Sequence, residues 1–148
     1  MELLVFQLED SRYALPLGEV QEVVRAVEVT PLPGAPEVVR GVIDVRGVIT
    51  PVFDLRARLD MPVKDVEPSD QFVLASAAGR SVALHVDAVE WMATVSDDEI
   101  ASATTAQASP HIAGIARLPD GLALIHDLAT FWSADESTAL NGAMRSAR

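Results

Sequence analysis

The chain repeats one pattern of short apolar segments, and this repeat constrains its fold more than any other feature. Moving 69 positions along the sequence brings similar residues into register, pairing Leu3 with Phe72, Leu4 with Val73, Leu15 with Leu84 and Val20 with Val89. Moving 73 positions does the same further along, pairing Gly41 with Gly114, Val52 with Ile125 and Asp54 with Asp127. The polar stretch 101–110 accommodates the four residues by which the offsets differ. We therefore expect a duplicated fold with two similar halves.

The apolar segments themselves are typical of β-strands. Within residues 3–17, two runs rich in β-forming residues flank the turn-forming sequence Glu-Asp-Ser, which predicts a hairpin. Within residues 41–55, two further runs flank an Arg-Gly turn, which predicts a second hairpin with Gly47 at a positive φ angle. The second half repeats this order, so the fold class is mainly β, with five short strands in each of two small barrels.

Short helices are expected between and after the strands. Apolar residues at helical spacing predict a helix over 18–26. The repeated Asp54 and Asp127 predict N-caps of brief helices that follow the last strand of each half. From Ser133, a serine followed by acidic residues is typical of a helix start, and we expect this final helix to fray after Met144.

We expect the chain to form a single folded unit with three approximate parts. The first barrel spans 1–66, the second spans 67–135, and the C-terminal helix and tail occupy 136–148. Segments of roughly 70 residues lie near the lower limit of independent stability, so the two halves should pack closely on each other. The strands at the ends of the halves could also be exchanged between the barrels.

Composition excludes several classes of protein. Apolar residues make up 49% of the 148 positions, but their runs are too short to cross a bilayer, and the first residues lack a secretory signal. The chain has no cysteine, so it builds neither a disulfide nor a thiolate metal site. A formal charge of −11 repels nucleic acid and anionic lipid. We expect a cytoplasmic protein with a basic or neutral protein partner, without nucleic-acid binding or membrane insertion.

Nothing in the sequence predicts catalysis, a metal or a cofactor. The three histidines are His85, His111 and His126. His85 shares a strand face with Asp87, whereas His126 and the aspartate after it point to opposite faces, so neither pair completes a metal site. Ser109 lacks the glycines of a nucleophile elbow, and no glycine-rich phosphate-binding motif is present.

The segment from Gly41 to Arg56, GVIDVRGVITPVFDLR, resembles the signature of the CheW-like domain family. This family contains the coupling proteins of bacterial chemotaxis. Residues 4–8, 12–23, 30–36 and 86–90 are also similar to the family pattern. The similarity covers roughly residues 3–135, which is nearly the whole chain.

The resemblance implies two packed five-stranded SH3-like barrels and a protein without catalytic activity. It implies that the chain links the regulatory domain of the histidine kinase CheA to the cytoplasmic tip of methyl-accepting chemotaxis receptors, within membrane-associated arrays. No kinase module or receiver domain accompanies the CheW-like segment here, which favours a stand-alone coupling protein. The alternative is a CheW-like adaptor of another sensory pathway, such as twitching or gliding, with a different receptor or scaffold.

The resemblance also assigns candidate partner-binding residues. Val20, Glu22 and Arg46 match the receptor-facing groove of the family, and we expect Glu22 and Arg46 to meet across its rim. Arg40 and Gly41 match a basic residue and a glycine at which the family is sensitive to change.

Two further positions have either a binding or a structural role. Asp44 stands where the family usually has asparagine, and its charge, two residues from Arg46, would weaken or redirect receptor recognition. Gly47, like Gly41, is explained by hairpin geometry alone as well as by a partner. Arg46 projects from a turn where packing requires no basic residue, which favours a partner contact or an ion pair.

Overall fold

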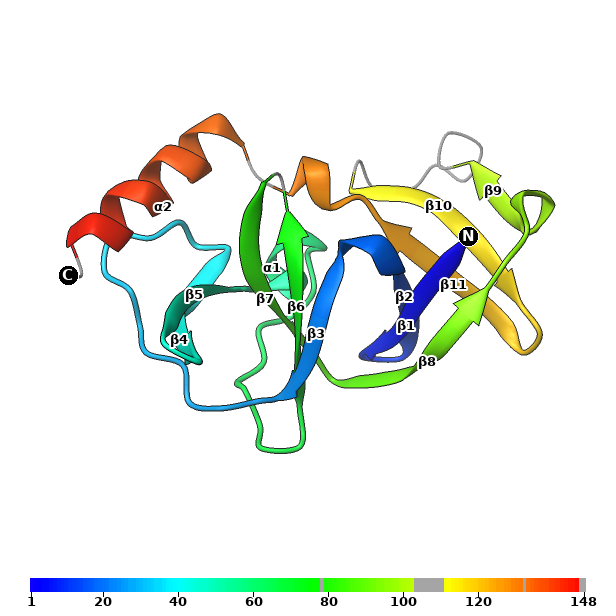
Figure 1. Ribbon diagram of the computed structural model, residues 1–148, viewed down its shortest axis with the longest axis horizontal. Coiled ribbons are helices and arrows are strands. Elements are labelled where there is room, and N and C mark those ends of the chain that lie inside the picture. Colours follow the sequence, from blue (N-terminus) through cyan, green and yellow to red (C-terminus); the bar gives the residue numbers. More distant parts are fainter. Residues whose placement is uncertain (78, 103–110, 132, 147–148) are drawn as a thin grey trace.

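The computed structural model describes residues 1–77, 79–102, 111–131 and 133–146 (Figure 1). Its strands form two sheets that lie side by side, and helix α2 lies along the outer side of the five-stranded sheet. The mainly β fold predicted from the sequence is confirmed. Neither sheet closes into a full ring of paired strands among the described residues.

The six-stranded sheet follows the order β8-β1-β2-β11-β10-β9, and the five-stranded sheet follows β3-β6-β7-β5-β4. The first consists of β1 (Glu2–Leu8), β2 (Ser11–Pro16), β8 (Ala88–Thr94), β9 (Ile100–Ser102), β10 (Ile112–Leu118) and β11 (Gly121–His126). The second consists of β3 (Val20–Arg25), β4 (Val39–Val45), β5 (Val48–Phe53), β6 (Gln71–Ala77) and β7 (Arg80–Val86). The short β9 is the strand that brings the first sheet to six instead of the expected five.

The first hairpin of each half lies in the sheet formed by the rest of the other half. Hairpin β1–β2 pairs with β8 on one side and, in parallel, with β11 on the other. Its counterpart in the repeat, β6–β7, pairs with β3 and, in parallel, with β5. Each sheet therefore needs strands from both halves of the sequence.

The helix expected over 18–26 is not formed. A 3₁₀ turn, η1 (Leu17–Glu19), leads into strand β3 instead. The pairing of β3 with β6 shifts register between Val20 and Glu22, and this bulge disturbs the two-residue alternation of apolar side chains. The resulting spacing of valines imitates a helix, but these β-branched residues pack well on a pleated sheet.

The other helices agree with the sequence. Asp54 caps α1 (Leu55–Arg58), accepting hydrogen bonds from the backbone N–H groups of the second and third residues after it. Asp127 caps η3 (Leu128–Thr130) by accepting one hydrogen bond, from the backbone N–H of Ala129. Helix α2 (Ala134–Ser146) continues two residues past the expected point of fraying, and η2 (Asp97–Glu99) precedes β9. None of the described helices is long and apolar enough to cross a membrane.

Residues 103–110 lie outside the described part of the structure. They include most of the polar stretch that accommodates the change of repeat offset. They also include Ser109, the serine that lacks the glycines of a nucleophile elbow.

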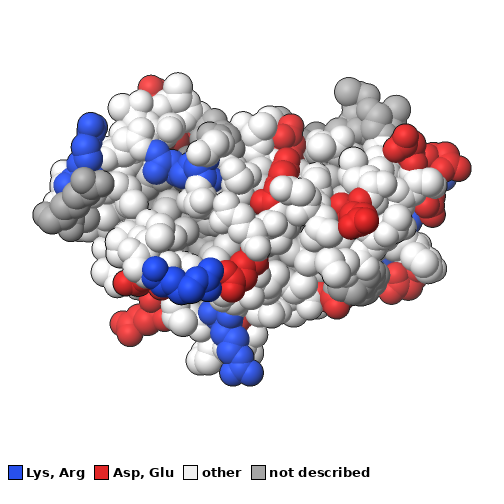
Figure 2. All heavy atoms as spheres, in the orientation of Figure 1, with Lys and Arg blue, Asp and Glu red and all other residues white. Residues whose placement is uncertain are grey.

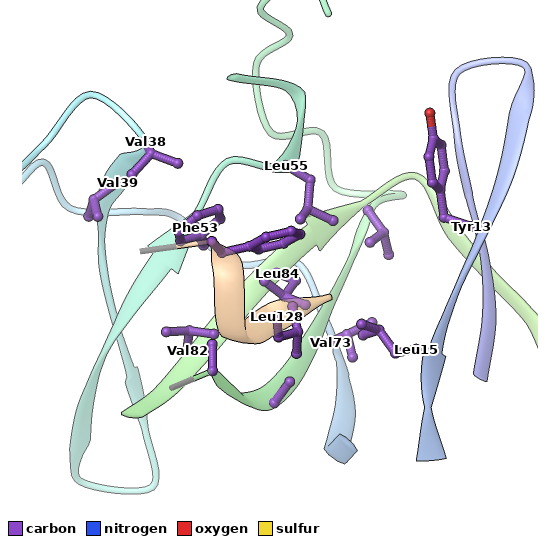
Figure 3. Packing of buried hydrophobic residues seen from close by; sticks show 14 of the residues in the cluster. Tyr13, Leu15, Val38, Val39, Phe53, Leu55, Val73, Val82, Leu84 and Leu128 are labelled. Carbon is purple, nitrogen blue, oxygen red and sulfur yellow. The ribbon is translucent and has the colours of Figure 1, made fainter. Parts of the chain in front are cut away.

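The main hydrophobic core lies between the two sheets. Figure 3 shows Phe53, Leu55, Leu84 and Leu128 pointing toward one another, with Leu15 approaching from the six-stranded sheet. All five side chains are buried. Two smaller clusters belong to one sheet each, the first to the six-stranded sheet and the second to the five-stranded sheet. The large shared cluster ties the halves into one body.

We predict that residues 1–66 alone will not fold. In that fragment β1 and β2 would lose β8 and β11, and β3 and β5 would lose β6 and β7. Unpaired edges and an exposed core leave too little burial to offset the conformational entropy. The measurement is a two-dimensional amide NMR spectrum of the fragment beside that of the full chain. Well-dispersed fragment signals would contradict the prediction.

Candidate protein-interaction site

A groove of about 400 Å³ opens where the five-stranded sheet leaves its two edge strands unpaired. One wall is β3 and the other is the β4–β5 hairpin, while Leu74 and Val82 of β6 and β7 lie in the lining between them. The side chains that line the groove are those of Gln21, Glu22, Val45, Arg46, Val48, Thr50, Leu74, Ser81 and Val82. The groove thus combines an apolar lining with polar and charged side chains.

The hairpin wall is shaped by a two-residue turn. Val45 pairs with Val48, and between them Arg46 and Gly47 take φ angles of 48° and 86°. Two successive positive φ angles are the geometry that matches the twist of a two-residue hairpin, and glycine adopts it without strain. The Asp44 carboxylate accepts a hydrogen bond of 2.7 Å from the backbone N–H of Gly47. Asp44 therefore supports the turn that presents Arg46.

The expected contact between Glu22 and Arg46 is present. Arg46 donates from both terminal nitrogens to the two carboxylate oxygens of Glu22, with 3.2 Å between Nη1 and Oε1. The hydrogen bond from Arg46 lowers the pKa of the Glu22 carboxyl below its ordinary value. This bidentate ion pair joins β3 to the hairpin across the groove, and the Arg46 side chain remains 70% exposed.

Only some of the sequence-predicted residues meet in this groove. Glu22 and Arg46 line it, and Asp44 and Gly47 build its turn. Val20 packs against the main core, although it belongs to the same strand as Glu22.

Arg40 and Gly41 lie elsewhere on β4. Arg40 Nε lies 3.4 Å from Asp54 Oδ2, and its Nη2 donates to the backbone carbonyl of Lys64. A side chain at Gly41 would meet the carbonyl oxygen of Thr30, only 2.2 Å from the position of its Cβ. Both residues therefore belong to the contact between β4 and the connecting segments.

Sequence reasoning missed the polar residues that line the groove. Gln21 Nε2 donates to Ser81 Oγ at 3.2 Å, and Thr50 is almost fully buried. No local signal marks these residues, because β3, β5 and β7 become neighbours only through pairings between distant strands.

The face in Figure 2 divides by charge. Acidic side chains dominate the part formed by the six-stranded sheet, on the right, whereas most of the basic side chains lie over the five-stranded sheet and α2. A mixed-charge, partly apolar surface therefore characterises the half of the molecule that holds the groove.

The buried histidines have structural surroundings. His85 Nε2 lies 2.7 Å from Asp70 Oδ2, and burial lowers the pKa of His85 against the attraction of that carboxylate. His126 stacks on Tyr13 at a ring distance of 4.9 Å and meets Phe131 edge-on at 5.3 Å. Among the described residues, no group of three His, Cys, Asp or Glu side chains is placed to hold a metal ion.

Asp87 does not join His85, although both were expected on one strand face. Its carboxylate binds the guanidinium of Arg56 at 2.5 Å and accepts the backbone N–H of Glu9 at 2.9 Å. Arg56 Nε also donates to Glu9 Oε1 at 3.1 Å. Arg56 is only 1% exposed, while the Glu9 side chain is 49% exposed, so this ion network is a partly buried contact between the two sheets.

Comparison with known proteins gives a consistent picture. The family model described as CheW-like domain matches residues 2–136. The Chemotaxis protein CheW of Rhizobium meliloti is 36% identical over 99 residues, covering 67% of this chain and 64% of that protein. That of Bacillus subtilis is 31% identical over 102 residues, covering 69% and 65% respectively. The alignments thus span slightly less than two thirds of these relatives.

The fold has a close counterpart among solved structures. The scaffolding protein TtCheW from Thermoanaerobacter tengcongensis has a TM-score of 0.81 and 27% sequence identity, and the match covers 91% of this chain and 94% of TtCheW.

We predict that Gly41→Ala destabilises the protein far more than Gly47→Ala. The Cβ at position 41 would overlap the Thr30 carbonyl, which is held in place by hydrogen bonds, so we expect a loss of about 3 kcal/mol or more. A Cβ at position 47 would meet no other atom, so Gly47→Ala costs only the strain of an alanine at a positive φ angle, about 1 kcal/mol. Urea denaturation of both variants provides the measurement. Equal losses would contradict the role of the Thr30 contact.

We predict that His126→Leu reduces the acid sensitivity of the fold. Burial, with a smaller contribution from His111, lowers the pKa of His126 to about 3. The unfolded chain binds a proton at this histidine below about pH 6.5 while the folded chain does not, so stability is complete above that pH and falls as the pH decreases. Between pH 7 and 5, the wild type should lose about 2 kcal/mol more than the variant in urea denaturation. Equal losses in both proteins would contradict this assignment.

Proposed function

The chain belongs to the CheW-like domain family, and from this premise we propose that it is a non-catalytic coupling protein that scaffolds a chemotaxis signalling assembly. Its proposed partners are the regulatory domain of the histidine kinase CheA and the cytoplasmic tip of a methyl-accepting chemotaxis receptor. Its proposed place of action is the cytoplasm, at arrays of such receptors. The names of the relatives, which are chemotaxis proteins and a scaffolding protein, support this role.

The observation that carries the proposal is the groove bridged by the Glu22–Arg46 ion pair. Val48, which is 61% exposed, and the partly buried Val45 offer apolar surface for a protein side chain. The ion pair at the groove presents one acid and one base in a fixed arrangement, so a partner with complementary charges is oriented as it binds. We propose that this groove receives the helical receptor tip.

Recognition of a helix by an apolar groove explains how such a protein works without chemistry. The apolar face of an amphipathic helix fits a groove, while charges at the margin select the register. A contact of this size gives modest affinity, and many simultaneous contacts in an array compensate for it. A separate surface must hold the kinase, because an adaptor has to bind both partners at once.

The surroundings of two of the three histidines support the non-catalytic role. His85 is bound to Asp70, and His126 is buried among aromatic rings. Neither histidine is placed for acid–base chemistry on a substrate in solvent.

We predict that charge reversals at the groove are coupled. Glu22→Lys and Arg46→Glu should each weaken binding of a receptor cytoplasmic fragment about tenfold, and the double variant should recover part of the loss because the pair is restored in reverse. Binding of the CheA regulatory domain should stay unchanged. Isothermal titration calorimetry with each purified partner provides the measurement.

Two controls accompany this experiment. Asp120→Lys breaks another exposed ion pair, with Arg12, outside the groove and should leave receptor binding intact. The Tm of every variant should differ from that of the wild type by less than about 3 °C, because exposed ion pairs stabilise a fold only weakly. Strictly additive losses would refute the pairing at the groove. Failure of the wild-type protein to bind either partner would refute the coupling function.

A further inference from the structure

A second and larger cleft, of about 500 Å³, lies beyond the other end of β3 and shares no lining residue with the groove. One wall is the segment that follows β3, and the other is the segment that leads from α1 to β6 (Figure 1). It is lined by Ala26, Val27, Glu28, Val29, Pro31, Arg40, Val66, Glu67 and Pro68. We propose that this cleft is a docking site for a partner segment that carries a large apolar side chain next to basic residues.

The first wall is held firmly although it belongs to no sheet. Thr30 and Val42 exchange two backbone hydrogen bonds of 2.8 and 3.0 Å, which fix the wall against β4. The backbone N–H of Ala26 donates to the carbonyl of Asp70 at 3.0 Å, which ties it to the opposite wall. Gly41 permits the close approach of Thr30 to β4. The wall is therefore ordered before any partner arrives.

Charged groups hold the second wall. Lys64 Nζ lies 3.4 Å from Asp87 Oδ1 and 3.6 Å from Asp70 Oδ1, and the Lys64 carbonyl accepts from Arg40. Asp70 and Glu67 exchange two hydrogen bonds of 2.9 Å that close a turn at the cleft. A preformed cleft loses little conformational entropy when a partner binds, and this low cost favours a binding role for the cleft.

The lining selects an apolar side chain. Six of its residues are valine, proline or alanine, and the prolines offer no N–H group to a polar ligand. Val27 is 51% exposed although it is strongly apolar, so covering it gains hydrophobic free energy. The volume lies within the range of small ligand pockets and accommodates one large aromatic or aliphatic side chain.

The charges of the cleft select basic neighbours for that side chain. Glu28 comes from the first wall and Glu67 from the second, and both are exposed. Arg40 does not oppose them, because its guanidinium faces Asp54 at 3.4 Å and donates to the Lys64 carbonyl. Lys64 Nζ lies 4.0 Å from Glu67 Oε2 and offsets part of that charge, so Glu28 contributes most of the attraction for a basic neighbour. The formal charge of −11 over the whole chain adds attraction for a cationic segment at long range.

The inference rests on the proposed coupling function in one respect only: an adaptor requires a second binding surface, and the cleft would provide it. Its test therefore measures the cleft directly. Two synthetic probes differ only in charge: an acetylated, amidated Gly-Lys-Phe-Lys-Gly peptide and the matched Gly-Glu-Phe-Glu-Gly peptide. Each is titrated into the isotopically labelled full chain, and NMR shifts of the backbone and of the valine methyl groups are followed.

We expect the lysine peptide to shift the signals of Val27, Val29 and Val66, and the glutamate peptide to bind at least about fivefold more weakly. The double variant Glu28→Lys and Glu67→Lys should weaken binding of the lysine peptide by roughly five- to tenfold and reverse the preference. Glu37→Lys is the control, with one charge reversal against the two of the double variant: it changes an exposed acid on the β3–β4 connection that does not line the cleft, and it should leave binding unchanged.

Three results would overturn the proposal. The first is the absence of shifts at the valines with either peptide at millimolar concentration. The second is a pattern of shifts spread over the acidic surface, which indicates attraction by net charge alone. The third is an equal loss of affinity in the double variant and in the Glu37→Lys control. None of these results bears on receptor binding at the groove, so the two proposals fail separately.

Discussion

The buried guanidinium of Arg56 is the interaction on which the joint between the two sheets depends. Arg56 follows the last residues of β5, yet its partners come from two turns far away in the sequence: Glu9 from the β1–β2 turn and Asp87 from the end of β7. Asp87 in turn accepts the backbone N–H of Glu9, so each of these three residues contacts the other two where the chain crosses from one sheet to the other. An ion pair of this kind contributes less to net stability than its geometry suggests, because two charges lose their hydration. The Arg56 guanidinium keeps one carboxylate partner when either Glu9 or Asp87 is lost, whereas the loss of both would leave a buried charge uncompensated, which is strongly destabilising. The network thus fixes how the sheets meet more than it stabilises each of them.

The same network extends to the surfaces proposed as binding sites. Asp87 also attracts Lys64, whose carbonyl accepts a hydrogen bond from Arg40, and these contacts fix the second wall of the cleft. The segment from Gly41 to Arg56 runs through all of these features in order: close approach of the cleft wall at Gly41, the groove turn at Asp44–Gly47, the core at Phe53 and the joint at Arg56. This concentration of roles gives the signature sequence of the family a physical basis, since Gly41, Asp44 and Arg56 each make a contact that depends on their residue type.

Local physics made much of this structure predictable. The hairpins followed from runs of β-forming residues beside turn chemistry, the caps from Asp54 and Asp127, and the final helix from Ser133 and the acids after it. The Glu22–Arg46 contact was expected from the family resemblance. What failed or stayed open depends on pairing between distant strands. A repeat reveals that two halves are alike, but it does not say whether a hairpin pairs within its own half or with the other one, and here it is exchanged. The strand β3 was mistaken for a helix because a bulge is set by its partner β6. The Gln21–Ser81 contact arises only once β6 and β7 are inserted between β3 and β5, whereas the His85–Asp70 contact forms at the base of the β6–β7 hairpin.

The positions of groove and cleft have a mechanical consequence for a coupling protein. Both surfaces use β3 and β4, but at opposite ends: Glu22 and Arg46 belong to the groove, whereas Ala26 and Arg40 line the cleft. Arg46, in the turn that follows β4, is six positions after Arg40, a span of at most about 20 Å at the rise of a strand. Strand β3 is fixed by β6, and β4 by β5 and by the Thr30 bridge, so this spacing is rigid. Two partners held at these sites would therefore keep a constant distance and orientation. Neither site needs to change shape when the other is filled, because a rigid link transmits position directly, which is what the proposed coupling function would require of it.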